Sequence, residues 1–185
     1  MTSKAKKLPD MWVDPEDDPR ETDGNPVGEL ATLLDYLGYQ RKTLELKCAD
    51  LDAGQLARRS VEPSTMSLLG LLRHLAKVEH TWFRITMQGN DIPRLYATES
   101  DRDADFNGAV ADQDVVAEAW ASWRREVAHA EEFVAQSESL DVMSTHPTRD
   151  PICLRELLVH LIEEYARHNG HADLIRERID GRTGQ

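Results

Sequence analysis

Two side chains of types that commonly bind metal ions, Glu164 and His168, lie four positions apart in the last apolar segment of the chain. Residues four apart stand above one another on one face of a helix. The row that contains them otherwise carries mainly leucine and isoleucine: Leu157, Leu161, Glu164, His168, His171 and Ile175. Because a buried carboxylate without a partner is very costly, we expect something to compensate the charge of Glu164.

A third candidate, His74, lies between Leu71 and Val78 in an earlier apolar segment, three and four positions from them. With Glu164 and His168 it would give two imidazoles and one carboxylate from two different helices. Three protein ligands and an open position are typical of a catalytic rather than a structural metal site. A set of two histidines and one glutamate suits zinc first, with nickel, iron or manganese as alternatives.

Spacing alone leaves two other interpretations open. His74 could be a core histidine that is hydrogen-bonded to a carbonyl group. Glu164 and His168 could form a buried ion pair, with Arg167 or Arg155 nearby. The spacing of Glu164 and His168 also occurs on helices by chance, so residue types alone do not decide between a metal site and these alternatives.

The elements that would position these side chains are four long amphipathic helices. Apolar residues recur with helical spacing after residue 26 to about residue 47, and over about 67–88, 113–137 and 153–179. The expected core seam of the first helix is Val27, Leu30, Leu33 or Leu34, Leu37, Arg41 and Leu44. Asp52 is placed to cap a short helical turn. Since no strand-like alternation of any length is present, the pattern predicts an all-α four-helix bundle.

Residues 89–112 have no sustained period and are predicted to form a long loop. A helix of about 22 residues is roughly 33 Å long, and about ten extended residues would cover that length. The segment is therefore long enough for a crossover, and we expect the second and third helices to be parallel.

Composition limits the classes of function. The 185 residues allow one domain, with a poorly ordered or extended arm over 1–25 and the bundle over 26–185. A net charge of −12 opposes binding to nucleic acid or to an anionic membrane surface. No apolar run approaches the roughly 20 residues that span a bilayer. The N-terminal lysines are not followed by an apolar stretch, so we expect a cytoplasmic protein in which Cys48 and Cys153 are free thiols.

Three stretches resemble the DinB/YfiT-like superfamily, in particular its branch of mycothiol transferases and DinB-like proteins of unknown function. They are SLLGLLRHLAKVEHTWF at 67–83, LRELLVHLIEEYARHNGHADLIRERIDGRTG at 154–184 and RKTLELKCADLDAGQLARRSVEPSTMSLLGLLRHL at 41–75. The resemblance implies a four-helix bundle of up-down-down-up order. It also implies a metal triad that falls on His74, Glu164 and His168, where the glutamate is similar to that of the mycothiol-dependent maleylpyruvate isomerase-like members.

The same resemblance implies a metal-dependent S-transferase that joins a small thiol such as mycothiol to an electrophile. A coordinated thiol is deprotonated, and the thiolate is the nucleophile. His171, Glu163 or Glu79 could move protons, and the sequence does not choose among them. Proteins with this resemblance are usually dimers, and the seams of the first and third helices could support a homodimer.

Two other functions fit the same residues. The first is a metal-dependent hydrolase, in which the ion would lower the pKa of a bound water. The second is a non-enzymatic metal-binding or stress-related protein, since a fold does not determine a function. Gly170, in the middle of the last predicted helix, could admit either a ligand or a closely packed helix.

Overall fold

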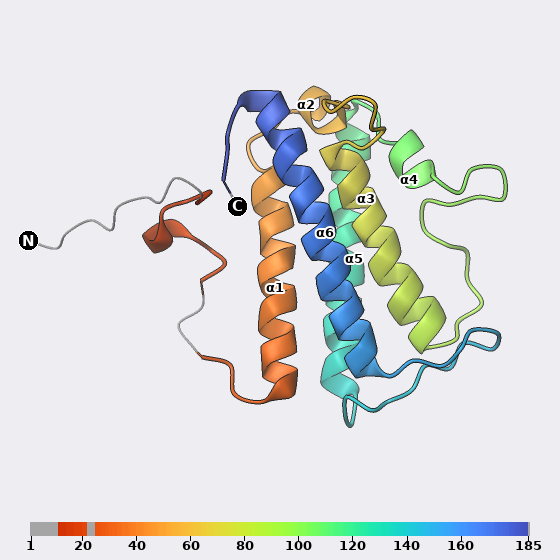
Figure 1. Cartoon of the computed structure of the whole chain (residues 1–185). Coiled ribbons are helices and arrows are strands. Elements are labelled where there is room, and N and C mark those ends of the chain that lie inside the picture. The colour runs from red at the N-terminus through yellow and green to blue at the C-terminus, as the bar shows by residue number, and fades with distance from the viewer. Residues whose placement is uncertain (1–10, 22–24, 185) are drawn as a thin grey trace, which may run out of the picture.

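The computed structural model describes residues 11–21 and 25–184, and within these ranges its regular elements are all helical. Four of them are long: α1 (Glu29–Cys48), α3 (Leu68–Glu79), α5 (Gln113–Gln136) and α6 (Leu154–Asp180). They lie side by side, with α1 and α6 running in one direction and α3 and α5 in the opposite one (Figure 1). α1 packs mainly on α6, and α3 packs on both α5 and α6. None of the described helices is long and apolar enough to cross a membrane.

The helix ends are set by local signals that the sequence carries. Ser67 caps α3, because its Oγ accepts a hydrogen bond from the amide of Gly70 at 3.1 Å. Asp52 caps the short α2 (Ala53–Ala57), as predicted, and Gln55 completes the capping box. α6 ends at Gly181, whose φ of +78° gives the left-handed conformation that glycine adopts readily. Ser67 and Gly181 thus place the start of α3 and the end of α6 close to the predicted bounds.

α3 continues without a break into a π-helical segment, η2 (His80–Met87), so that the two together cover the predicted second helix. The wider turn is visible in the backbone, where the amide of Gln88 donates to the carbonyl of Phe83 at 3.1 Å. π-helical turns often accompany functional sites. Here η2 places the ring of Trp82 against the ring of His160 on α6, with ring centroids 4.7 Å apart.

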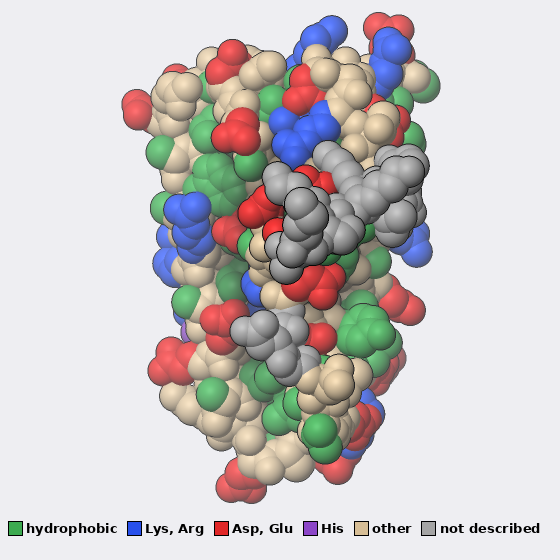
Figure 2. All heavy atoms as spheres, turned by 90° about the vertical axis from the view of Figure 1, so that its left-hand side faces the viewer, with side chains coloured by type: hydrophobic (Ala, Val, Ile, Leu, Met, Phe, Trp, Pro, Cys, Tyr) green, Lys and Arg blue, Asp and Glu red, His purple; other side chains and the backbone are tan. Residues whose placement is uncertain are grey.

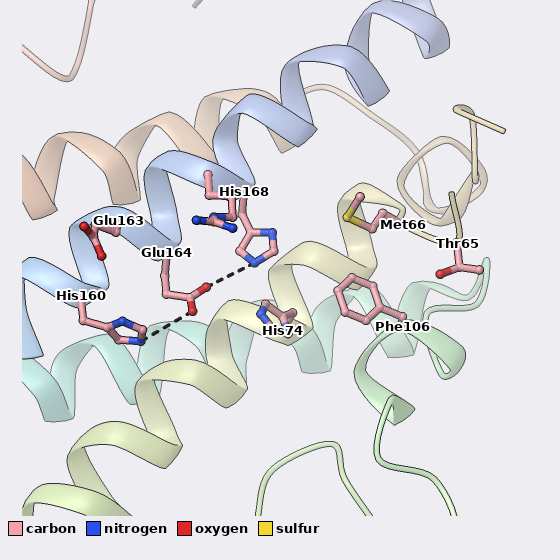
Figure 3. A pocket seen from close by; sticks show the side chains of 9 residues that line it. Thr65, Met66, His74, Phe106, His160, Glu163, Glu164 and His168 are labelled. Carbon is pink, nitrogen blue, oxygen red and sulfur yellow. Dashed lines mark ion pairs between the residues drawn. The ribbon is translucent and has the colours of Figure 1, made fainter. Parts of the chain in front are cut away.

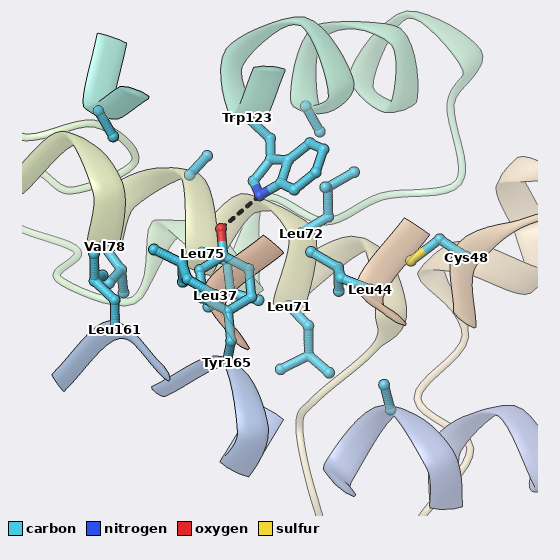
Figure 4. Close-up of a cluster of buried hydrophobic side chains, with 14 of the residues drawn as sticks. Leu37, Leu44, Cys48, Leu71, Leu72, Leu75, Val78, Trp123, Leu161 and Tyr165 are labelled. Atoms are coloured by element: carbon cyan, nitrogen blue, oxygen red, sulfur yellow. Dashed lines mark hydrogen bonds between the residues drawn. The ribbon is translucent and has the colours of Figure 1, made fainter. Parts of the chain in front are cut away.

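The core lies where α1, α3, α5 and α6 meet, and it is filled mainly by leucines (Figure 4). One polar network crosses it. The indole nitrogen of Trp123 donates to the Tyr165 hydroxyl at 2.8 Å, and that hydroxyl donates to Glu79 at 2.9 Å. Arg41 binds the same carboxylate oxygen through two nitrogens, at 2.9 and 2.7 Å. The network therefore ties α1, α3, α5 and α6 together inside the core.

The sequence pattern predicted a long loop for the connection between η2 and α5, but this connection contains the short helix α4 (Ala104–Asn107). Arg73 of α3 holds α4 in place, donating to the carbonyls of Asp105 at 2.9 Å and of Ala104 at 3.0 Å. Gly70 allows the close approach, since a Cβ there would lie 2.8 Å from the ring of Phe106. Four residues are too few for an apolar period, and tertiary contacts with α3 hold this turn.

The predicted seam of α1 is buried only in its C-terminal half. Leu37, Arg41 and Leu44 are buried, whereas Leu30 and Leu34 are exposed and Val27, which precedes the helix, is 88% exposed. The predicted seam positions Val27, Leu30 and Leu34 therefore do not face the core, because the buried contacts of α1 begin at about Leu33. On this side of the molecule, hydrophobic and acidic side chains are interspersed (Figure 2).

Trp12 packs onto the body of the protein and is 1% exposed. Three cations lie over its indole ring: the Lys47 ammonium at 3.8 Å from the ring centroid, and the Arg182 and Arg176 guanidinium groups at 3.9 and 5.2 Å. Arg182 also donates to the Trp12 carbonyl at 2.9 Å. Cation–π contacts with a desolvated tryptophan are among the stronger of their kind, so Trp12 joins the N-terminal segment to α1 and to the C-terminal end of α6.

Candidate metal centre

The structure brings the three predicted ligand residues together. His74 projects from α3, and Glu164 and His168 project from the facing side of α6 (Figure 3). One ligand atom from each lies within 4.8 Å of the others, which makes this a group of side chains able to hold a metal ion. The group faces a pocket of about 550 Å³ whose further lining residues are Thr65, Met66, Phe106, His160, Glu163 and Arg167. The ligand candidates are thus accessible to a small molecule.

The spacing of the donor atoms fits a divalent ion. His168 Nε2 lies 3.4 Å from Glu164 Oε2. Two donors at about 2.0–2.1 Å from a tetrahedral zinc ion are themselves about 3.4 Å apart. The side chains of Glu164 and His168 are 28% and 12% exposed, so one coordination face would remain open to the pocket. Two imidazoles and a carboxylate are also the donor types of catalytic zinc sites.

His74 is oriented by a carboxylate on its far side. Its Nδ1 lies 2.9 Å from Oδ2 of Asp105, a residue of α4 that is 1% exposed. Burial raises the pKa of Asp105, but hydrogen bonds from His74 and Lys77 outweigh it, so the pKa lies below its ordinary value. An ionised Asp105 keeps the proton of His74 on Nδ1 and leaves Nε2 free as a ligand. Metal-binding histidines commonly have such a partner.

Phe106 and His171 support the two imidazoles. The ring of Phe106 stacks on that of His74, with centroids 5.2 Å apart and planes inclined by 28°. His171 Nδ1 lies 3.3 Å from His168 Nδ1. Burial lowers the pKa of His168 to about 4, and the nearby His74 and His171 add to this effect. His168 is therefore neutral at pH 7, as a metal ligand must be.

The other candidates for proton transfer have different places. His171 is half-buried beside His168, and Glu163 is exposed on the pocket wall. Glu79 does not line the pocket and is 1% exposed in the core network with Arg41 and Tyr165. Burial raises its pKa, although the charge of Arg41 opposes this. The structure therefore does not bring Glu79 to this site.

The two alternative interpretations can be compared with the contacts observed. Nδ1 of His74 is bonded to a carboxylate rather than to a carbonyl. Arg155 pairs with Glu29 at 2.7 Å and with Asp141 at 2.5 Å, so it does not compensate Glu164. The ion-pair partners of Glu164 within the described ranges are His168 at 3.4 Å and His160 at 3.6 Å. Histidines thus flank Glu164 on both sides along α6.

Three residues of this site were not found from the sequence. His160 lies four positions before Glu164, so the same spacing that selects His168 also selects it. Asp105 and Phe106 had no such signal, because they lie among several aspartates in a segment without apolar periodicity. Their roles depend on the position of α4 against α3, which is a tertiary feature.

Comparison with known proteins identifies the family of this chain. A family model described as mycothiol-S-transferase matches residues 32–181, which include α1 to α6 almost completely and every residue of the candidate centre. Neither the curated proteins nor the solved structures provide a match. The match covers well over half of the chain. The chain therefore belongs to the mycothiol S-transferase family.

Proposed function

We propose that this protein is a metal-dependent S-transferase that joins mycothiol, or a closely similar small thiol, to a small electrophile. The convergence of His74, Glu164 and His168 on one pocket is the observation that carries the metal dependence. The family match supports the thiol. We expect zinc first, with nickel, iron or manganese as alternatives that the same donors accept.

A divalent ion bound there would lower the pKa of a coordinated thiol, so that the reactive thiolate is present at neutral pH. The residues of the chain prepare the site for it. Asp105 fixes the tautomer and orientation of His74. Nδ1 of His171 can accept a hydrogen bond from a protonated Nδ1 of His168. Nε2 of His168 is then unprotonated and able to bind the metal. Because these partners are already in place, little reorganisation is needed on binding.

The pocket has room for the reacting parts of two small molecules. Its volume of about 550 Å³ lies within the usual range for small-molecule sites. Met66 and Phe106 line one end, and His160 and Glu163 line the other, with the three ligand candidates between them (Figure 3). Two groups of the pocket wall could take up the proton of the thiol, Nε2 of His160 and the exposed carboxylate of Glu163. His171, which lies beside His168, is a third candidate.

We further infer that the architecture is the up-down-down-up bundle of DinB-like proteins, with the body of the domain beginning near residue 26. The opposite directions of α1 and α6 relative to α3 and α5 support this assignment (Figure 1). The connection of residues 88–112 then serves as the crossover, and it also carries Asp105 and Phe106 to the centre.

The proposal is tested with protein loaded with zinc, mycothiol and 1-chloro-2,4-dinitrobenzene, following loss of the thiol. The thiolate sulfur forms a bond to the ring carbon and chloride leaves with the bonding electrons. We expect saturable, metal-dependent consumption of the thiol, lost in His168→Ala together with the bound metal. His146→Ala, which alters a loop histidine outside the pocket, serves as the matched control. Cleavage of an ester without thiol would instead indicate a hydrolase, and the absence of both activities would favour a non-enzymatic protein.

A further inference from the structure

Arg167 lines the pocket of the candidate metal centre, immediately before the ligand candidate His168 on α6. Its guanidinium group makes no hydrogen bond or ion pair with any residue that the structure describes. Two buried arginines are bound to carboxylates, Arg41 to Glu79 and Arg176 to Asp180, both at 2.7 Å, whereas Arg167 is exposed on the pocket wall. Arg167 is thus a cation in the pocket that the fold itself does not use.

The proposed chemistry at the metal does not use this charge either. A divalent cation bound there would be balanced by the carboxylate of Glu164 and by one thiolate, which together would carry two negative charges. The positive charge of Arg167 therefore remains available for a further anion. Because the net charge of the chain is −12, its surface as a whole opposes anions, and the guanidinium group of Arg167 supplies a local attraction for them on the pocket wall.

Glu163 is the nearest candidate to neutralise Arg167 within α6, since the two are four positions apart with the glutamate first. This is the favourable order for a helical ion pair, but such a pair contributes only a few tenths of a kcal/mol. No nitrogen–oxygen distance of 4.0 Å or less joins the two side chains, although both line the pocket. A ligand carboxylate, which can accept two parallel hydrogen bonds from one guanidinium group, does not have to displace a formed pair.

We propose that Arg167 binds an anionic group of the electrophilic substrate, so that the protein acts on small electrophiles that carry a carboxylate or a similar acid. This inference rests on the proposed function, because it assigns the substrate class for the same pocket. Arg167 would then set specificity by binding the substrate beside the sulfur atom that attacks it. Neutral electrophiles with the same reactive group would be poorer substrates.

The test uses two reagents that differ in charge and share one reaction, iodoacetate and iodoacetamide. In both, the thiolate sulfur bonds to the CH₂ carbon, the carbon–iodine bond breaks, and iodide leaves with the electron pair. The two products, S-carboxymethyl-mycothiol and S-carbamoylmethyl-mycothiol, are prepared without enzyme, and their binding to the zinc-loaded protein is measured by calorimetry. We expect the parent protein to bind the carboxymethyl product about tenfold more tightly.

The variants separate Arg167 from the metal as the source of this preference. Arg167→Gln should bind both products equally, while its metal content stays that of the parent. Arg167→Lys should keep part of the preference, because an ammonium group retains the charge but loses the two-bond geometry. Glu163→Gln should increase the preference, since it removes a negative charge from the same wall.

The assignment of Arg167 would be overturned if the parent bound the two products equally, or if the preference persisted in Arg167→Gln. Either result would leave the proposed thiol transfer standing. Preference in Arg167→Gln would point to direct coordination of the carboxylate by the metal. Failure of both products to bind the zinc-loaded parent would contradict the proposed thiol transfer, and the inference on Arg167 would fall with it. A second measure of the same preference comes from the enzymatic rates with iodoacetate and iodoacetamide. Each is divided by the rate at which the same reagent reacts with mycothiol in the absence of enzyme.

Discussion

The Nδ1 atom of His74 lies 2.9 Å from Oδ2 of Asp105, although α3 and α4 are separated by η2 and the connection that follows it. Asp105 is buried and also contacts the Lys77 ammonium at 3.1 Å. A short helix in a connecting segment therefore determines how a ligand candidate on a core helix presents its second nitrogen.

The first prediction follows from this contact. Asp105→Asn should weaken zinc binding by about 10- to 100-fold, because the amide cannot supply the charge that holds the proton on Nδ1 of His74. The dissociation constant is measured by competition with a chelator. Asp103→Asn, an exposed position two residues earlier, is the matched control and should bind zinc like the parent. An unchanged affinity in Asp105→Asn would show that His74 is not a ligand held by this carboxylate.

The second prediction concerns Glu164→Gln, which preserves volume but removes an anionic ligand. If Glu164 binds metal, the variant should melt below the parent only when metal is present, because the ion stabilises the folded state by mass action. In excess chelator the two should melt close together, since Glu164 is 28% exposed and its partners are histidines. Thermal unfolding with and without chelator measures the difference. Equal destabilisation in both conditions would show that Glu164 is an ion-pair partner of the histidines and not a metal ligand.

The third prediction compares two helical glycines. Gly70→Ala would place a Cβ 2.8 Å from the ring of Phe106, so the ring must move from its stacked position on His74. We expect a loss of about 1–2 kcal/mol of stability and weaker zinc binding. Gly170→Ala meets nothing within 4 Å and should raise stability by about 1 kcal/mol with zinc affinity unchanged. Urea unfolding and zinc competition distinguish the pair, and similar behaviour of both variants would contradict a role for the Phe106 stack.

The fourth prediction concerns pH and lies away from the metal centre. Burial raises the pKa of Glu126, but hydrogen bonds from His80, Arg84 and Arg125 outweigh it and lower the pKa to about 2 from an ordinary 4.5. Because the folded pKa is the lower one, this stabilisation is complete above about pH 4.5 and is lost as the pH falls toward 2. Glu126→Gln should lack this component and be less stable than the parent at pH 7 by about 2–3 kcal/mol.

Urea unfolding at pH 7 and at pH 3 measures that effect. The stability of the parent should fall more between these values than that of Glu126→Gln. Glu132→Gln, which alters an exposed carboxylate on the same helix, is the control and should follow the parent. Parallel pH dependence of the parent and Glu126→Gln would show that Glu126 is not preferentially ionised in the folded state.

The parts of the structure that were predictable are those that depend on the spacing of residues within one helix. Apolar periodicity and caps such as Ser67, Asp52 and Gly181 define helix bounds within a few residues. The four-residue spacing of Glu164 and His168 places both on one side of α6, where the structure also has them. These features depend on one helix at a time, and a sequence contains all the information that they need.

The parts that were not predictable depend on contacts between elements. Glu79 follows His74 by five residues, which turns its side chain by about 140° around the helix, and only the packing of α3 against α1 and α6 shows that this direction is the core. The position of α4 depends on Arg73 and on the absence of a side chain at Gly70. Likewise, the exposure of Leu30 and Leu34 depends on where the buried contacts of α1 begin, which periodicity alone does not reveal.

The walls of the pocket come from two kinds of structure, and this has a consequence for how the protein can diverge. His74, Glu164 and His168 stand on helices whose other faces fill the core, so these helices can change little without loss of folding. Thr65 and Met66 precede α3, and Phe106 lies in the connection between η2 and α5. This end of the pocket is therefore built from connecting segments, which tolerate insertion and substitution. Descendants of such a gene can therefore acquire new substrates by exchanging loops while they inherit the ligand set unchanged, and a laboratory library confined to these segments would sample the same route.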